Sequence, residues 1–480
     1  MNTDSARALN SPPGEDEEQP LLAGSKAAAL VATLLLGVIA YQLNASMVTP
    51  ALPEMAKQLG TTTGSIAQVS SLFFLTGAIT GVVLSRLSDF TGRRKMLLAV
   101  LAVTAVGTLL CALAPNLPLL LTGRVLQGAS SAAFQLAYVM LNERLSAKVF
   151  GTALGIITAI NGGVGGLDGY LGGLLSDHFG FRSIFVVILL IGLAATACVA
   201  ALVPAETRPI TRGRMDWWGA ATLSIGLVCL TDGVSSGSSR GWTHPWTLGY
   251  LAGAVVFGVV FVAVERRIQT PLIAVQHLRS RQVWPIIVTT TLVLSGVFAV
   301  INFTVVVLSQ DAHVGYGLSA SRSALMFLTP AAVIGIFAAP LSGWLAGRTG
   351  WIPLLRVGLL LCVAALVLIA LTTQHRWIVF ALVALLGVFY NGLALTTLNG
   401  LGVIQSPKEA PAALPGLNGA GFGIGAGLGI GIVAPFAAHG TIGGYTTALW
   451  ISVGVTALAL LTSFCVSPTP QARRARPGTA

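Results

Sequence analysis

The sequence predicts an all-α protein that crosses a membrane many times. Of its 480 residues, 54% are hydrophobic and only 9% are charged, whereas about 25% of the residues of a soluble domain are charged. The apolar residues gather in runs of roughly 20, the length that a helix needs to cross a bilayer. A soluble protein of this composition would expose large apolar patches, so a lipid bilayer is the expected solvent.

Fourteen apolar runs are long enough to form such helices. They lie at residues 27–49, 65–84, 96–114, 118–141, 151–175, 183–203, 217–234, 246–264, 284–309, 323–346, 357–374, 377–400, 413–437 and 444–466. An even number of spans places both ends of the chain on the same side of the membrane. We therefore predict a multi-pass protein with fourteen transmembrane helices.

The distribution of basic residues supports this count, because Lys and Arg favour cytoplasmic loops. With the N-terminus in the cytoplasm, 21 of the 27 basic residues fall in inner segments and Arg124 lies within a helix. Five fall in outer segments: Lys57, Arg182, Arg240, Arg322 and Arg376. We predict a plasma-membrane protein with both termini in the cytoplasm, where 1–26 forms a disordered tail and 467–480 a second tail.

The composition argues against several other protein classes. The net charge of +11 does not indicate nucleic-acid binding, because the basic residues lie in short loops without interleaved aromatic side chains. The five cysteines stand alone in apolar runs, so neither a metal site nor a disulfide framework is expected. The six histidines are spread over different loops, unlike the clustered groups of a membrane enzyme. No phosphate-binding glycine loop with its Lys is found, which argues against ATP hydrolysis.

Two short segments resemble each other and indicate an internal duplication. Residues 85–92, after the second predicted helix, share Leu, Thr and Gly at matching positions with residues 343–350, after the tenth. Both segments lie on the cytoplasmic side in the predicted topology. Because transporters are often built from duplicated halves, we predict one six-helix bundle at 27–203 and another at 284–466. The linker at 204–283 then contains two extra transmembrane helices.

Several motifs resemble those of the major facilitator superfamily. The loop Ser85–Lys95 is similar to its signature between helices 2 and 3, and Arg124–Gly128 is similar to its fourth-helix motif. Asn44–Pro53, Asp216–Ala220 and Glu265–Ile268 resemble motifs of the fourteen-helix drug:proton antiporter family. The resemblance implies the major facilitator fold, with two six-helix bundles plus two inserted helices. It also implies export of drugs or antibiotics by proton antiport.

The sequence departs from that family at two positions that bear on proton coupling. Asn44 stands where the family's first-helix motif carries an aspartate, so this side chain cannot titrate. The fifth-helix motif Gly-Pro-x-x-Gly-Gly is replaced by Asp168–Gly173, which keeps the glycine pair and gains a carboxylate. A buried carboxylate can bind a proton near neutral pH, so we predict that Asp168 is a coupling residue. In the alternative, Asp168 faces water or pairs with Arg182.

Two further groups of charged residues are candidates for gating and coupling. Asp89, Arg93 and Arg94 are predicted to form a latch at the inner gate, in which Asp89 lies at the N-terminus of a neighbouring helix or pairs with a nearby Arg. Such a latch requires partial burial because exposed ion pairs contribute only about 0–1 kcal/mol. The alternative is a solvated loop whose charges only set the topology. Arg124 is predicted to be a buried coupling residue among polar neighbours. Its alternative is a side chain that extends to the membrane surface.

Polar and small residues within the predicted helices complete the candidate site. Lipid-facing amides are unfavourable, so polar side chains should line a central cavity or bond between helices. The cavity candidates are Asn44, Gln127, Tyr138, Asn302 and Asn391. Because small residues let helix backbones approach, close packing is predicted at Gly172, Gly173, Gly423 and Gly427. The last two belong to a run of alternating glycines from 419 to 431, whose two sets occupy opposite helix faces.

Together these features predict a secondary transporter of small molecules. We predict that it exports amphipathic compounds of the drug or antibiotic type across the plasma membrane, by proton antiport with alternating access. A proton-coupled importer or a uniporter of a small solute is the alternative, because Asn44 and the altered fifth-helix motif remove familiar coupling groups. The expected partners are a small-molecule substrate, protons and the lipid bilayer, with no nucleic acid, no cofactor and a monomeric state.

Overall fold

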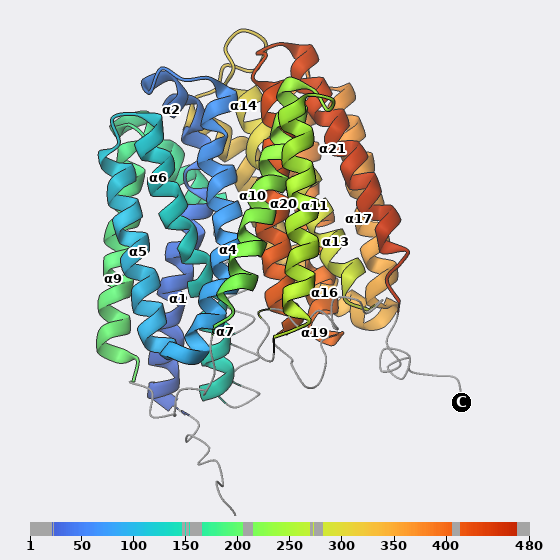
Figure 1. Ribbon diagram of the computed structural model, residues 1–480. Coiled ribbons are helices and arrows are strands. Elements are labelled where there is room, and N and C mark those ends of the chain that lie inside the picture. The colour runs from blue at the N-terminus through green and yellow to red at the C-terminus, as the bar shows by residue number, and fades with distance from the viewer. Residues whose placement is uncertain are drawn as a thin grey trace, which may run out of the picture.

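The computed structural model describes a bundle of long helices. The described residues are 24–145, 166–204, 215–268, 282–405 and 413–467, together with Leu22, Val149, Ala153 and Leu272. Within these ranges every regular element is helical. The start of α1 (Gly24–Ser46) and the end of α21 (Ile442–Ser463) lie at the same end of the bundle (Figure 1), here termed the proximal end. The opposite end is termed the distal end.

The helices of residues 24–204 form one side of the bundle, the N-terminal side (Figure 1). They are α1, η1 (Thr49–Ala51), α2 (Leu52–Gln58), α3 (Thr63–Ile66), α4 (Gln68–Thr91), α5 (Arg93–Leu113), α6 (Leu117–Gln127), η2 (Gly128–Ser130), α7 (Ser131–Arg144), the helical residues 166–179 and α9 (Arg182–Leu202). Local sequence explains several boundaries. Gly92 separates α4 from α5 with a φ of 96°, which glycine adopts readily. The Asn116 side chain caps α6 by accepting from Leu119 N.

Residues 282–467 form the other side, the C-terminal side. Its helices are α13 (Trp284–Val293), η3 (Leu294–Phe298), η4 (Val300–Thr304), α14 (Val305–Gln310), α15 (Ala320–Ser323), η5 (Ala324–Leu328), α16 (Thr329–Thr349), α17 (Trp351–Leu371), α18 (Arg376–Leu386), η6 (Gly387–Leu395), α19 (Thr396–Ile404), α20 (Ala413–Ala437) and α21. The segments η3, η4, η5 and η6 are π-helical. Between the sides, α10 (Trp217–Arg240) and α11 (Pro245–Glu265) pack on each other, and α10 also contacts α4 and α20.

Twelve helices of the described residues are long and apolar enough to cross a membrane, so the predicted count of fourteen is not reached. The predicted segment 118–141 is helical as α6, η2 and α7 but is not among the twelve, because Arg124 and Gln127 make it more polar. The predicted segment 151–175 lies mostly outside the described residues. Large apolar side chains also cover the outer surface, as on α11, where Val255 is 66% exposed. The chain is a multi-pass membrane protein.

The largest apolar cluster joins the two sides of the bundle. It contains Met47 and Phe74 of the N-terminal side and Phe303 and Ala426 of the C-terminal side, each at most 3% exposed. The rings of Phe74 and Phe298 meet edge to face with centroids 5.3 Å apart. Buried apolar surface therefore holds the two sides together in this conformation.

Helix α20 has glycines on two faces, and each face lies against a neighbouring helix. A Cβ added at Gly423 would lie 2.8 Å from the carbonyl oxygen of Phe74, and one at Gly427 would lie 3.1 Å from that of Ser71, both on α4. On the other face, a Cβ added at Gly425 would lie 2.4 Å from a carbonyl oxygen of α13. Such approaches require the absence of a side chain. The glycines therefore place α20 close to α4 across the interface and close to α13 on its own side.

Hydrogen bonds join the two sides between the middle of the bundle and the distal end. The Gln310 amide donates to the carbonyl oxygen of Pro50 (2.9 Å). The Thr329 hydroxyl donates to the carbonyl oxygen of Gly166 (2.7 Å). Asp177, near the end of helix 166–179, accepts hydrogen bonds from the start of α15. The distal end is therefore closed in this conformation.

Candidate functional site

Arg124 is fully buried in α6 and is held by neutral groups of three helices. Its Nε donates to the carbonyl oxygen of Val69 on α4 (2.7 Å). Its Nη1 donates to the carbonyl oxygen of Asn44 on α1 (3.1 Å) and to Oε1 of Gln127 (2.7 Å). The guanidinium also lies over the ring of Phe73 at 4.3 Å. The side chain is 0% exposed, so the alternative in which it extends to the membrane surface does not occur.

Among the described residues, the network around Arg124 contains no carboxylate. The acids that form ion pairs among the described residues are Asp89 and Glu143, and their partners are Arg86 and Arg93 rather than Arg124. Within the same residues, Nη2 of Arg124 and Oδ1 of Asn44 are buried without a hydrogen-bond partner. Asn44 thus lies beside a buried guanidinium that no described acid neutralises.

Asp168 lies on helix 166–179 and contacts α1. It is 1% exposed, and its Oδ2 is 2.5 Å from the hydroxyl oxygen of Ser46. Its Oδ1 has no partner among the described residues. Arg182 instead donates to the carbonyl oxygen of Ala114 (2.7 Å). Both alternatives for Asp168, exposure to water and pairing with Arg182, are therefore absent from this conformation.

The hydrogen bonds around Ser46 are compatible with two protonation states of Asp168. The Ser46 oxygen accepts from the Gln42 side chain (3.1 Å), and its hydroxyl is also placed to donate to the carbonyl oxygen of Gln42 (2.9 Å). A hydroxyl has one hydrogen, so it can donate either to Gln42 or to Asp168. An ionised Asp168 would accept from Ser46, whereas a protonated Asp168 would donate to Ser46, which then donates to Gln42. The two patterns differ by one proton and by one hydroxyl rotation.

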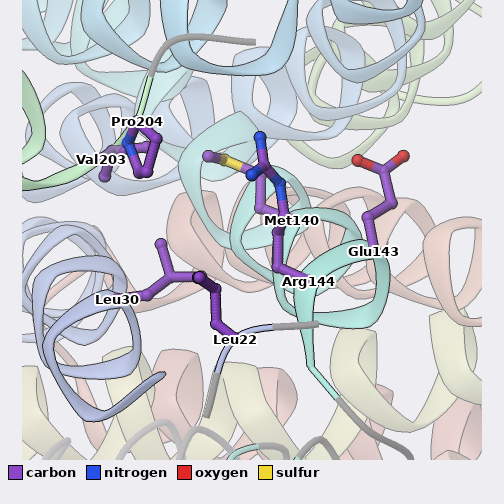
Figure 2. Close-up of a pocket in the computed structure, with 7 residues that line it drawn as sticks. All are labelled: Leu22, Leu30, Met140, Glu143, Arg144, Val203 and Pro204. Atoms are coloured by element: carbon purple, nitrogen blue, oxygen red, sulfur yellow. The ribbon is translucent and has the colours of Figure 1, made fainter. Parts of the chain in front are cut away.

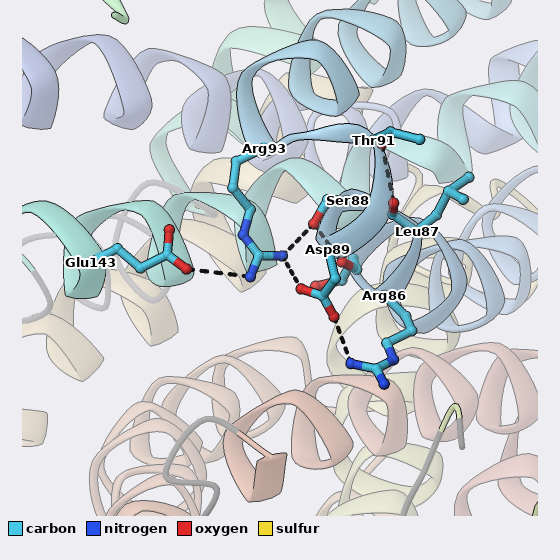
Figure 3. Close-up of polar contacts among 8 residues, drawn as sticks. Arg86, Leu87, Ser88, Asp89, Thr91, Arg93 and Glu143 are labelled. Carbon is cyan, nitrogen blue, oxygen red and sulfur yellow. Dashed lines mark hydrogen bonds and ion pairs between the residues drawn. The ribbon is translucent and has the colours of Figure 1, made fainter. Parts of the chain in front are cut away.

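Asp89 lies at the proximal end, in a cluster of charges shown in Figure 3. Its Oδ2 is 2.7 Å from Nη1 of Arg86, and its Oδ1 is 2.5 Å from Nη1 of Arg93. Arg93 also pairs with Glu143 on α7 at 3.3 Å. Arg94 points elsewhere and donates to the carbonyl oxygen of Ala200 (2.6 Å). The partners of these groups among the described residues belong to the N-terminal side, and a gating role for the cluster stays a prediction.

The five cavity candidates make different contacts in this conformation. Asn44 and Gln127 belong to the Arg124 network, and a hollow beside Asn44 is lined by none of the other four. The ring of Tyr138 lies 4.9 Å from that of Phe134. The remaining two amides bond to carbonyl groups, Asn302 to Phe298 and Asn391 to Ala331, both at 3.3 Å.

A second hollow lies at the proximal end beside the Asp89 cluster (Figure 2). It is lined by Leu22, Leu30, Met140, Glu143, Arg144, Val203 and Pro204. Most of these side chains are apolar, and the two charged ones belong to the end of α7. The hollow therefore offers few groups that would recognise a polar solute.

Sequence reasoning missed three residues that contact the predicted site residues or join the two sides of the bundle: Ser46, Glu143 and Asp177. Gln42 and Ser46 stand four residues apart, a spacing that brings helical side chains together, but nothing in the sequence connects them with residue 168. Glu143 is the acid nearest the end of the fourth predicted helix. Asp177 follows the fifth predicted helix and resembles an ordinary loop residue.

Comparison with known proteins decides the family. The family model of the major facilitator superfamily matches residues 34–430. The chain belongs to the major facilitator superfamily. This member is therefore a membrane transporter, and its all-helical architecture follows that of its superfamily.

Two relatives of the chain have names that indicate different transported solutes. The uridine/deoxyuridine transporter of Lactococcus lactis subsp. cremoris is 37% identical over 456 residues, which are 91% of this chain and 94% of the relative. Multidrug resistance protein Stp of Mycobacterium tuberculosis is 29% identical over 397 residues, which are 82% of this chain and 72% of the relative. These matches do not single out the fourteen-helix drug:proton antiporter family that the motifs predicted.

Solved structures of the superfamily support the fold. The peptide transporter POT in complex with sulfate aligns with a TM-score of 0.67 at 15% identity, over 96% of this chain and 98% of that one. The human organic anion transporter MFSD10 aligns with a TM-score of 0.62 at 15% identity, over 92% and 100% of the two chains. At this identity the likeness concerns the fold alone.

Proposed function

We propose that this transporter moves a nucleoside-type solute, a polar and uncharged small molecule, and couples its movement to protons. The observation that carries the proposal is the 37% identity to a uridine/deoxyuridine transporter over nearly the full length of both chains. The amides of Asn302 and Asn391 in the C-terminal side bond to backbone carbonyl groups here and would exchange these for a base or a sugar in an open conformation. This substrate class differs from the amphipathic drugs that the motifs predicted.

The proposed proton site is Asp168. Its burial and the two hydrogen-bond patterns around Ser46 support a group that takes up and releases one proton during the cycle. Ser46 stands two residues after Asn44, so the carboxyl of Asp168 lies beside the stretch of α1 where relatives carry their aspartate. In this proposal the acid has moved from α1 to the neighbouring helix while the site has stayed in place.

The proposal also includes the predicted architecture and orientation. Fourteen spans would be reached if 117–144 and the helix ending at residue 179 cross the membrane in addition to the twelve apolar helices. Both termini would then lie in the cytoplasm, in accordance with the basic residues of the inner loops. Bundles at 27–203 and 284–466 would rock against each other to give alternating access. Epitope tags at each end test this arrangement, and labelling of either tag from outside intact cells would contradict it.

Uptake of radiolabelled uridine tests the substrate class. Cells that lack their own nucleoside uptake should accumulate uridine when they express this chain, and a protonophore should abolish the accumulation. Asp168→Asn should bind uridine but fail to accumulate it, whereas Asp232→Asn, an acid-to-amide change at an exposed position of α10, should behave as the parent. No uridine-dependent signal in binding or uptake would reject the nucleoside proposal.

A second candidate function is the export of amphipathic compounds by proton antiport. The likeness to multidrug resistance protein Stp over 82% of this chain favours it. Everted membrane vesicles supplied with a panel of drugs would distinguish the two candidates. Proton-dependent drug accumulation without uridine transport would favour export, and the reverse would favour the nucleoside proposal.

A further inference from the structure

Asp177 binds the start of a helix from the other side of the bundle. It stands two residues before the end of helix 166–179, and its Oδ1 accepts from the backbone N–H of Ala320 (3.2 Å). Its Oδ2 accepts from the backbone N–H of Ser321 (3.0 Å) and from the Ser321 hydroxyl. One carboxylate of the N-terminal side thus holds two backbone donors and one hydroxyl of the C-terminal side.

The position of these donors explains why a carboxylate fits there. The helical span that begins at Ala320 continues to Thr349, and the first N–H groups of a helix have no partners within it. The side chain of Ser319 caps the helix by accepting from Arg322 N (3.4 Å), which leaves the first two N–H groups for Asp177. The positive end of the helix dipole also favours a negative charge at this point.

The charge state of Asp177 suits this role. Partial burial acts to raise the pKa of the Asp177 carboxyl, but the hydrogen bonds from Ser321, Ala320 and Ser319 outweigh it and hold the pKa below its usual range. The group lies beyond the predicted span 151–175 and is exposed at the distal end. It is therefore a carboxylate at neutral pH.

The backbones of the two helices touch at the same place. A Cβ added at Gly173, one turn before Asp177, would lie 2.6 Å from Cα of Ser321. At the preceding residue, a Cβ added at Gly172 would lie 2.0 Å from the carbonyl oxygen of Met47. Helix 166–179 therefore packs closely against both Met47, just after α1, and the start of α15.

We propose that Asp177 is the latch of the distal gate, which holds this end of the transporter closed and is released when the transporter opens on that side. A contact that exists in only one conformation shifts the equilibrium toward that conformation. At the other end, the partners of Asp89 among the described residues are Arg86 and Arg93 of its own side. The inference goes beyond the substrate and the proton site, because it holds for any transported solute.

A cysteine behind the latch provides the test. Leu328 is 4% exposed, and its side chain lies beside Gly169 of helix 166–179. The test rests on the proposed orientation, in which the distal end faces outside. In a background without the five native cysteines, Leu328→Cys should react slowly with a membrane-impermeant maleimide added to the outside of right-side-out vesicles. Adding Asp177→Ala should accelerate the reaction by about three- to tenfold, as expected for the loss of about 1 kcal/mol at an exposed helix N-terminus.

Three further variants make the test specific. Asp177→Asn keeps an acceptor oxygen without the charge and should give an intermediate rate. Ser321→Ala keeps the backbone donors and should give a smaller acceleration than Asp177→Ala. Glu54→Ala is the matched control, because the carboxylate of Glu54 bonds only to Gln58 on its own helix (2.8 Å), and its rate should equal that of the parent. A parental labelling rate in Asp177→Ala, at equal surface expression, would overturn the proposal whatever the substrate proves to be.

Discussion

Replacement of Ser46 by alanine should move the pH at which proton-coupled transport is half-maximal. Among the described residues Ser46 is the hydrogen-bond partner of Asp168, with 2.5 Å between the two oxygens. A hydrogen bond to a charged group contributes about 1.5–3 kcal/mol, and one between neutral groups about 0.5–1.5 kcal/mol. The ionised carboxylate therefore loses about 1 kcal/mol more than the protonated carboxyl when Ser46 is removed.

This difference sets both the direction and the size of the effect. The protonated form gains relative stability in Ser46→Ala, so Asp168 releases its proton only at higher pH. Because about 1.4 kcal/mol corresponds to one pH unit, the midpoint should rise by somewhat less than one unit. Initial rates of solute exchange in proteoliposomes, measured in a series of buffers of increasing pH, give the midpoint.

Thr33→Val is the matched control for this experiment. Thr33 is buried on the same helix, and its hydroxyl donates only to the carbonyl oxygen of Ala29 (2.8 Å). Its removal should leave the midpoint unchanged. The reasoning is refuted if Ser46→Ala has the midpoint of the parent, or if the midpoint moves to lower pH.

Three other substitutions test the remaining contacts. Arg124→Lys should lower the transport rate at least about tenfold with normal membrane insertion, because one ammonium cannot reach all the acceptors that the guanidinium holds; transport assays at equal expression measure this. Gly429→Ala should lower the stability of the purified protein by about 1–3 kcal/mol, because the new Cβ would lie 2.4 Å from the carbonyl oxygen of Ser295. Gly431→Ala is the control and should leave the stability unchanged, because the nearest neighbour of its Cβ would be 4.0 Å away. Thermal unfolding of the two purified variants measures the difference. Asp89→Asn should slow transport without affecting insertion, and an unchanged rate would reduce the cluster to a topology signal.

The membrane class and the glycine geometry of α20 could be predicted because they depend on local patterns. Apolar runs of the right length predict helices, and the spacing of Gly423, Gly425 and Gly427 fixes their faces whatever the neighbours are. The predicted fourteen spans exceed the twelve apolar helices of the described residues, because Arg124 makes the helical segment 118–141 more polar and 151–175 lies mostly outside those residues. A polar residue that serves the interior weakens the signal by which a span is recognised.

The contacts of the candidate site depend on residues far apart in the sequence. Asp168 stood out as an acid within an apolar run, but its partner Ser46 is 122 positions away, and no local pattern connects the two. Asp89 pairs with Arg86 and Arg93, three and four residues away, so these contacts lie within reach of the local sequence, whereas a gating role stays a prediction. Asp177 carried no signal at all, because its role depends on a helix that starts 143 residues later.

Proton movement on addition of substrate tests the central claim most directly. Purified protein would be reconstituted in liposomes that contain a pH-sensitive dye, without an imposed gradient. Addition of uridine should change the internal pH with the parent protein, and Asp168→Asn should exchange labelled uridine across the membrane while the internal pH stays constant. An unchanged pH with the parent protein during measurable uridine transport, or the same pH change with Asp168→Asn, would contradict proton coupling through this residue.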